Sequence, residues 1–141
     1  MREVLFRGKR PYDGDWVEGN LFIPDKEDTP TQICIGTNIV RITYGIIPET
    51  IGQYTGLTDK NGKKIFEGDI VAGAVHWLER MKNGFVAFKD GSFGLIWYRG
   101  EVEQFNPFTS MCNVEYEVIG NIHDNPELLK CGFHYEEENL W

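Results

Sequence analysis

Cysteines are few in this sequence, and long apolar runs are absent. The cysteines, Cys34, Cys112 and Cys131, lie far apart, and an odd number at irregular spacing argues against a disulfide framework. We expect them to be small buried residues in a reducing compartment. No apolar run approaches the roughly 20 residues that a membrane span needs. The first residues, 1–4, show no basic region followed by an apolar core, so we expect no signal peptide. The predicted protein is soluble, intracellular and not bound to a membrane.

Basic residues are scarce in the last third of the chain. Residues 101–141 hold one basic and nine acidic residues, and this segment accounts for a net charge of −8. The first fifty residues carry a net −2 and the middle fifty a net +2, so the whole chain also sums to −8. An acidic surface repels phosphate, which disfavours sequence-independent binding of nucleic acid. The weakly basic middle keeps that binding open as an alternative.

The sequence also lacks a recognisable catalytic or metal-binding motif. Ser92 and Ser110 sit in no nucleophile elbow, and no phosphate-binding loop or dinucleotide fingerprint occurs. Cys131 and His134 have a Cys-x-x-His spacing with His123 upstream, but a zinc site needs about four ligands and no second pair accompanies them. We therefore predict no catalytic, cofactor-binding or metal-binding residues, and no cofactor.

Three groups of residues have a functional and a structural interpretation. The Asp59-Lys60-Asn61-Gly62 run resembles the start of a calcium loop, but its glycine comes two positions early, and we favour a hairpin. Pairs of glutamates at i, i+2 could serve a glycosidase, although on strands they share one solvated face. Tryptophans could stack on single-stranded nucleic acid, but without interleaved basic residues we favour a core role. The glutamates are Glu101, Glu103, Glu115 and Glu117; the tryptophans are Trp16, Trp77, Trp97 and Trp141.

Short strands and tight turns dominate the sequence. The chain is 41% hydrophobic and 13% aromatic, which is enough for a packed interior. Its 16 glycines are spread along the chain, which favours many short elements joined by turns over long helices. The clearest element lies within residues 51–71, where Asn61-Gly62 between apolar runs predicts a hairpin with a two-residue type I′ turn. Asp90-Gly91 predicts another such hairpin. Together these features indicate an all-β fold, most simply a small barrel with an additional sheet.

The remaining elements follow from β-branched and aromatic runs between turn residues. The run 16–23 contains Gly19, which indicates a bulge or a close approach of another backbone. Asn125, Pro126 and Gly132 predict a short helix over residues 125–130. Predicted strands are 4–6, 16–23, 32–35, 39–44, 69–75, 84–89, 92–98 and 114–121; predicted turns or loops are 7–11, 24–30, 67–69 and 100–111; residues 76–82 read as a helical turn or an irregular loop.

Several blocks of the sequence resemble the YopX family. They occur in the family's order and extend from Phe6 to Leu129, with a departure at 76–82 and after Lys130. The blocks are Phe6-Arg7-Gly8-Lys9, residues 14–21, residues 48–57, residues 59–71, and residues 117–122 with 125–129. The resemblance implies an all-β fold of two packed parts, a phage or prophage origin and a site of action in the bacterial cytoplasm. It implies no activity and brings no catalytic residues.

We therefore expect a YopX-like all-β fold in which short hairpins form a small SH3-like barrel beside a coiled N-terminal sheet, with one short C-terminal helix. The expected parts are an N-terminal sheet lobe (1–50), a barrel-like lobe (51–130) and an acidic tail (131–141). The preferred hypothesis is a non-catalytic phage accessory protein that binds a host or phage protein, or itself as a homo-oligomer. The alternative is a nucleic-acid-binding barrel face near Lys60, Lys63, Lys64 and Lys89, and an enzyme ranks last.

Overall fold

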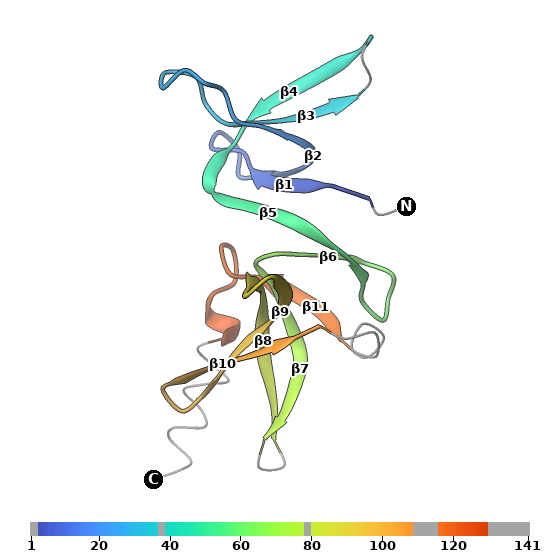
Figure 1. The fold of residues 1–141 in the computed structure, drawn as a ribbon, viewed down its shortest axis with the longest axis vertical. Helices are drawn as coiled ribbons and strands as arrows, with labels where there is room; N and C mark the ends of the chain where they lie inside the picture. Colours follow the sequence, from blue (N-terminus) through green and yellow to red (C-terminus); the bar gives the residue numbers. More distant parts are fainter. Residues whose placement is uncertain (1–2, 37–38, 78–79, 109–115, 130–141) are drawn as a thin grey trace. The chain divides into compact units, whose positions relative to one another are not determined.

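The fold consists of antiparallel strands in two sheets (Figure 1). A computed structural model describes residues 3–36, 39–77, 80–108 and 116–129. The six-stranded sheet has the order β4-β3-β2-β1-β5-β6, and the five-stranded sheet has the order β10-β9-β8-β7-β11. The strands are β1 Phe6–Lys9, β2 Trp16–Phe22, β3 Gln32–Gly36, β4 Arg41–Gly45, β5 Ile47–Thr58, β6 Lys64–Phe66, β7 Asp69–Trp77, β8 Arg80–Lys89, β9 Ser92–Arg99, β10 Val102–Pro107 and β11 Glu117–Asn121.

The all-β prediction is confirmed, but the predicted small SH3-like barrel is not confirmed. Among the described residues neither sheet closes on itself, because β10 and β11 end one sheet and β4 and β6 end the other. Hairpin turns connect most neighbouring strands, which explains why short-range turn signals correctly predicted an all-β fold. Whether a sheet closes into a barrel depends on pairing between strands far apart in sequence, which those signals do not show. Within the described ranges, no helix has the length and apolar character that crossing a membrane requires.

The chain divides into two compact units, residues 1–56 and residues 57–141. The division falls inside β5, whereas the sequence interpretation places it after Thr50. In unit 1, Val17, Ile33 and Ile46 form the buried core. In unit 2, a larger cluster gathers strands from β6 to β11. Its buried members are Ile65, Val71, Val86, Leu95 and Val118.

Gly19 is the point in unit 1 where two backbones approach closely. A side chain at this position of β2 would collide with the carbonyl oxygen of Cys34 on β3, and Asn20 pairs directly with Cys34. The prediction of a close backbone approach at this glycine is therefore confirmed. The first two strands also pair, with Phe6 opposite Gly19.

The two predicted type I′ hairpins differ in the structure. At the β8–β9 turn, Asp90 has φ 53° and Gly91 has φ 80°, the two positive values that this turn type requires. At the other turn only Gly62 is positive, with φ 83°, and Asn61 is not. There the Gly62 N–H donates to the Asp59 carbonyl, and the Asp59 N–H donates to the Lys63 carbonyl. The hairpin is confirmed, but the two-residue turn is wrong, because the loop starts at Asp59.

Three segments that we predicted as loops, or for 76–82 as a helical turn or an irregular loop, contain strand residues. The basic link 7–11 begins inside β1, whose pairing with β2 extends to Lys9 opposite Trp16. In the segment 76–82, β7 extends to Trp77 and β8 starts at Arg80, and these two residues pair. The predicted turn or loop segment 100–111 contains β10, which includes Asn106 and Pro107. In each case pairing with a neighbouring strand overrides a weak local signal.

The remaining predictions concern the C-terminal third. Helical backbone is present at residues 127–129, inside the predicted helix, and β11 occupies the second half of the predicted strand 114–121. The loop 24–30 has the expected exposed, irregular backbone. The acidic tail, together with Ser110, Cys112, Glu115, Cys131, His134 and Trp141, lies outside the described residues.

Candidate functional site

The most distinctive surface of unit 1 is the β3–β4 hairpin, where an apolar face continues beyond its core. Ile33 is fully buried and pairs with Tyr44, and two positions further along each strand Ile35 pairs with Ile42. Side chains two positions apart on a strand point to the same face, so Ile35 and Ile42 extend the face that covers the core. Yet Ile35 is 41% exposed and Ile42 is 54% exposed. The apolar face therefore reaches past the side chains that cover it.

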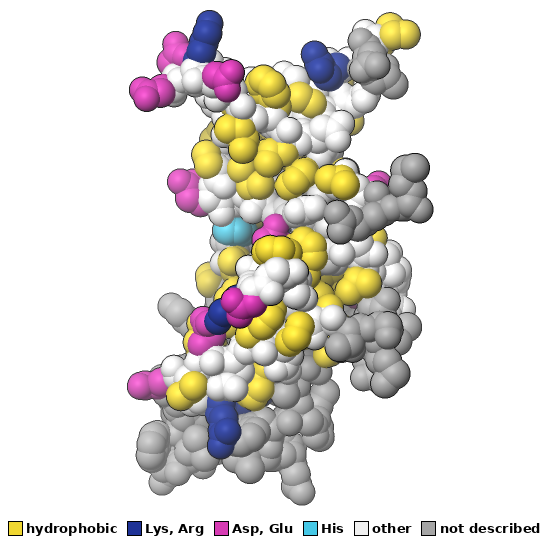
Figure 2. All heavy atoms as spheres, in the orientation of Figure 1, with side chains coloured by type: hydrophobic (Ala, Val, Ile, Leu, Met, Phe, Trp, Pro, Cys, Tyr) yellow, Lys and Arg dark blue, Asp and Glu magenta, His cyan; other side chains and the backbone are white. Residues whose placement is uncertain are grey.

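Two further apolar residues precede β4 in the same hairpin. Ile39 and Val40 precede β4 and are 93% and 70% exposed. We refer to Ile35, Ile39, Val40 and Ile42 as the hairpin surface. Figure 2 shows hydrophobic side chains gathered on the visible face of unit 1, in the upper half of the view. Single exposed apolar residues are ordinary, whereas a contiguous group on one element indicates a contact surface.

Charge is nearly absent from this hairpin. Between Gln32 and Gly45 the only charged residue is Arg41, in a chain with a formal net charge of −8. β4 is also the edge strand of its sheet. Natural edge strands are usually protected by charged side chains, proline, a bulge or a covering segment. β4 carries one charged side chain, Arg41, and has no proline and no register shift over its five residues. The hairpin surface thus lies beside a strand edge that carries a single charge.

The Asp59 carboxylate holds the turn between β5 and β6 through its hydrogen bonds. This side chain is 5% exposed. Its Oδ1 accepts from the backbone N–H groups of Asn61 (2.8 Å) and Lys63 (2.9 Å), and its Oδ2 accepts from that of Val118 (3.0 Å). Burial raises the pKa of Asp59, but the three N–H donors and the Lys63 charge outweigh it and lower the pKa. The carboxylate joins the turn to β11, which is a structural role.

The glutamates singled out in the sequence contact cations and amides. Glu103 accepts from the Lys89 ammonium at 3.1 Å. Glu117 accepts from the Asn61 side chain at 3.2 Å and lies 3.8 Å from the Lys60 ammonium. Two of the four lysines considered for nucleic-acid binding are therefore already in ion pairs. Glu101 is exposed.

Of the tryptophans singled out in the sequence, Trp97 is buried, as a core role predicts.

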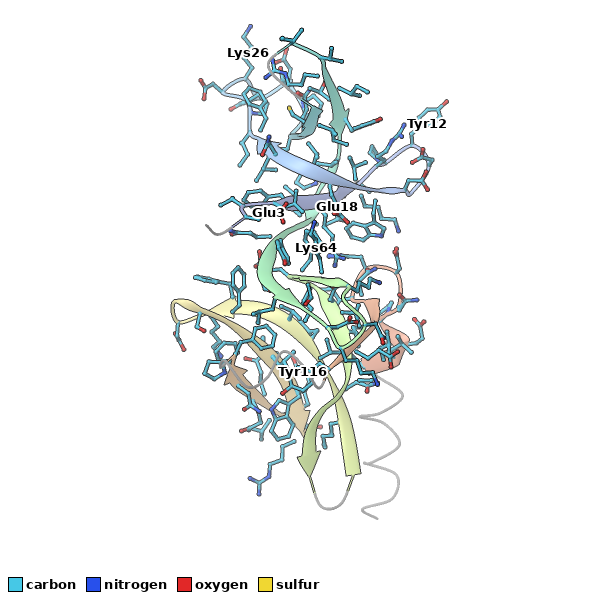
Figure 3. All side chains as sticks on the ribbon, turned by 90° about the vertical axis from the view of Figure 1, so that its right-hand side faces the viewer. Glu3, Tyr12, Glu18, Lys26, Lys64 and Tyr116 are labelled. Atoms are coloured by element: carbon cyan, nitrogen blue, oxygen red, sulfur yellow. The ribbon has the colours of Figure 1, made fainter. Side chains whose placement is uncertain are left out.

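In the N-terminal part an aromatic side chain contacts a basic one. The Arg7 guanidinium lies 4.7 Å from the centroid of the Trp16 ring, and Arg7 itself is buried. Tyr12, in the β1–β2 turn, is 96% exposed and points away from the strands (Figure 3).

The remaining polar candidates do not converge. Ser92 donates from its hydroxyl to the Phe93 carbonyl at the start of β9. His123 lies in the turn after β11, where its backbone N–H donates to the Asn121 side chain. Among the residues that the structure describes, no group of three or more His, Cys, Asp and Glu side chains is arranged to hold a metal ion.

Sequence reasoning predicted strands at 32–35 and 39–44 but missed the exposed apolar surface of the β3–β4 hairpin. The available signal was the pattern of Ile33, Ile35, Ile39, Val40 and Ile42 in a segment with one charge. Alternation predicts which side chains share a face. It does not reveal how far the core extends along that face, because the core is built by distant strands.

Comparisons with known proteins agree with the resemblance seen in the sequence. A crystal structure of protein EF1440 from Enterococcus faecalis is similar, with 25% sequence identity and a TM-score of 0.53; the match covers 92% of this chain and 99% of that chain. No curated protein matches. The sequence profile of the YopX protein family matches residues 5–130. The match spans most of the sequence, and the chain belongs to the YopX family.

Proposed function

We propose that this chain is a non-catalytic protein-binding module of a phage or prophage, acting in the bacterial cytoplasm, and that the hairpin surface is its binding surface. The observation that supports this is the Ile35–Ile42 pair, which continues a core-facing apolar face into solvent. Covering such a pair with a partner gains about 25 cal/mol for each Å² of apolar area removed from water. A polypeptide can cover the pair and add main-chain hydrogen bonds at the β4 edge.

The polar residues that might serve an enzyme have structural contacts, which supports the non-catalytic part of the proposal. Asp59 receives backbone N–H groups, Glu117 contacts Asn61, and Glu103 contacts Lys89. The lysine contacts weigh against the nucleic-acid alternative in the same way, because a lysine held by a carboxylate contributes less to phosphate binding.

A pair of double variants tests the proposal. Ile35→Thr/Ile42→Thr keeps β-branched residues in both strands while removing the apolar surface. Val102→Thr/Ile119→Thr is the matched control, since both residues are exposed β-branched strand residues of unit 2. Self-association of each purified protein is measured by sedimentation. Capture of another protein is tested with nuclease-treated lysate of prophage-bearing bacteria. Every captured protein is then purified and titrated directly against each variant.

The proposal requires a saturable association, with another protein or with itself, that the control retains and Ile35→Thr/Ile42→Thr loses at least tenfold. It is overturned if the hairpin variant associates as tightly as the unaltered chain. It is equally overturned if neither kind of association is detected at high micromolar concentration, or if a substrate is turned over at a rate that one substitution abolishes.

A further inference from the structure

The direction of the backbone groups on β4 follows from one hydrogen bond. Gln32 pairs with Gly45, so the next pair along the hairpin is Thr31 with Ile46, and the Ile46 N–H donates to the Thr31 carbonyl at 3.1 Å. Ile46 therefore directs its backbone groups toward β3. Because these directions alternate along an antiparallel strand, Ile42 and Tyr44 do the same, and the remaining residues direct theirs away from β3. The outward residues are Arg41, Thr43 and Gly45.

From this arrangement we infer that two copies of the chain pair through β4, antiparallel, about a two-fold axis at Thr43. The inference rests on the proposed function and names the partner as a second copy. In this register Thr43 lies opposite Thr43 of the partner subunit, and Arg41 lies opposite the partner's Gly45. All outward backbone groups of the strand then meet outward groups of the other copy. If the axis lay at Ile42 or at Tyr44 instead, the residues at one end of each β4 would have no β4 residue of the other copy opposite them.

The side chains of β4 suit this register on both faces. Ile42 would lie opposite the partner subunit's Tyr44, an aromatic with a β-branched residue, and the two threonines would meet on the other face; both kinds of cross-strand pair are favourable. Ile42 and Tyr44 would form a pair without hydrogen bonds between them, the type in which side chains lie closest. The exposed part of Ile42 would then be covered by the partner's Tyr44 ring, which in its own subunit lies 4.8 Å from the Arg10 guanidinium.

Charge does not oppose this pairing. Arg41 is the only charged residue between Gln32 and Gly45, and the register places the two Arg41 residues at opposite ends of the paired strands. Four residues along a strand correspond to about 13 Å, which exceeds the Debye length of about 8 Å at physiological salt. A two-fold axis makes each contact occur twice, so an edge that carries a single charge, Arg41, can pair with its own copy. An interface of one strand pair with its flanking apolar residues is small, and we expect dissociation in the micromolar range.

Two substitutions at the axis test the pairing. Thr43→Pro removes an N–H that points away from β3, so the β3–β4 ladder keeps its own bonds while the contact between subunits is lost; proline is tolerated at such edge positions. Thr43→Val keeps the N–H and the branched side chain. In sedimentation over low to high micromolar concentration, we expect the unaltered chain and Thr43→Val to dimerise. Thr43→Pro should remain monomeric, with a β-sheet circular dichroism spectrum equal to that of the unaltered chain.

A cross-linking measurement covers the case in which Thr43→Pro does not fold. With the three natural cysteines replaced by serine, Thr43→Cys should form a covalent dimer under mild oxidation, because Cα atoms in a hydrogen-bonded pair lie about 5.5 Å apart, within disulfide reach. Lys26→Cys, in the exposed loop of the same unit, is the control and should not cross-link. The inference is overturned by a dimer that Thr43→Pro leaves intact, or by equal cross-linking at both positions.

Failure of this inference can be separated from failure of the proposed function. A monomeric chain that still captures a different protein through the hairpin surface, with loss in Ile35→Thr/Ile42→Thr, overturns the two-fold pairing and leaves the proposed function standing. A chain that neither dimerises nor binds a protein overturns both.

Discussion

The Asp59 carboxylate accepts a hydrogen bond from the backbone N–H of Val118, 3.0 Å from Oδ2 to N. These residues are separated by 59 positions. The next residue of the turn also bonds to the segment before β11, because the Lys60 N–H donates to the Tyr116 carbonyl. One buried side chain thus connects a hairpin turn with the last strand of unit 2.

We expect Asp59→Asn to lower the free energy of unfolding by about 1–3 kcal/mol, because an amide NH₂ would face a backbone N–H donor where a carboxylate oxygen now accepts. Urea unfolding at neutral pH, followed by circular dichroism, measures the change. Glu101→Gln, an exposed residue of the β9–β10 turn, makes the same chemical change without burial and should stay within about 0.5 kcal/mol of the unaltered chain. Equal stabilities of the two variants would contradict the role assigned to Asp59.

The same contact predicts a pH dependence. The pKa of Asp59 is lowered in the folded chain because its backbone donors outweigh the effect of burial. A group whose folded pKa lies below its unfolded value, about 3.9, stabilises the fold fully above the unfolded pKa and loses that contribution as the pH falls through the folded pKa. The stability difference between the unaltered chain and Asp59→Asn should therefore narrow below about pH 4. Unfolding curves from neutral to acid pH measure it, and a difference that stays constant or widens would refute the prediction.

Gly19 provides a prediction for unit 1. Any Cβ at this position would collide with the Cys34 carbonyl oxygen, and a backbone atom cannot move aside as a flexible side chain can. We expect Gly19→Ala to destabilise the fold by about 1–3 kcal/mol. Gly45→Ala is the control, since its Cβ would meet only Pro30 at 3.7 Å, an ordinary contact. Thermal unfolding of both variants distinguishes them, and a Gly19→Ala protein as stable as Gly45→Ala would show that the strands do not approach as described.

The apolar, nearly uncharged hairpin surface predicts an association that depends little on salt. Raising the salt concentration from about 0.05 M to about 0.2 M should change the dissociation constant of the association by less than about threefold. Binding through lysine–phosphate contacts would instead weaken by about a thousandfold or more if several phosphates were neutralised. Sedimentation or titration across this range gives the answer, and a loss of tenfold or more would favour an electrostatic interface.

The sequence by itself determined the strand class, most hairpins and the turns that depend on glycine. These properties are local: a positive φ at Gly91 or Gly62 and the alternation within a strand follow from a few adjacent residues. The Asp90-Gly91 turn illustrates this, whereas Asn61-Gly62 shows its limit, because the Asp59 side chain reorganised that turn through bonds to Lys63 and Val118.

Only the tertiary structure decided whether the sheets close, which strand lies at an edge, and which apolar side chains remain uncovered. Segment 102–107 became a strand because β9 pairs with it along its whole length, although its own residues indicate a turn. Ile33 and Ile35 are chemically identical and share a face, yet one is fully buried and the other 41% exposed. The difference arises because Val17 and Ile46, distant in sequence, pack with Ile33 in the core, and burial depends on such long-range contacts, which no local pattern specifies.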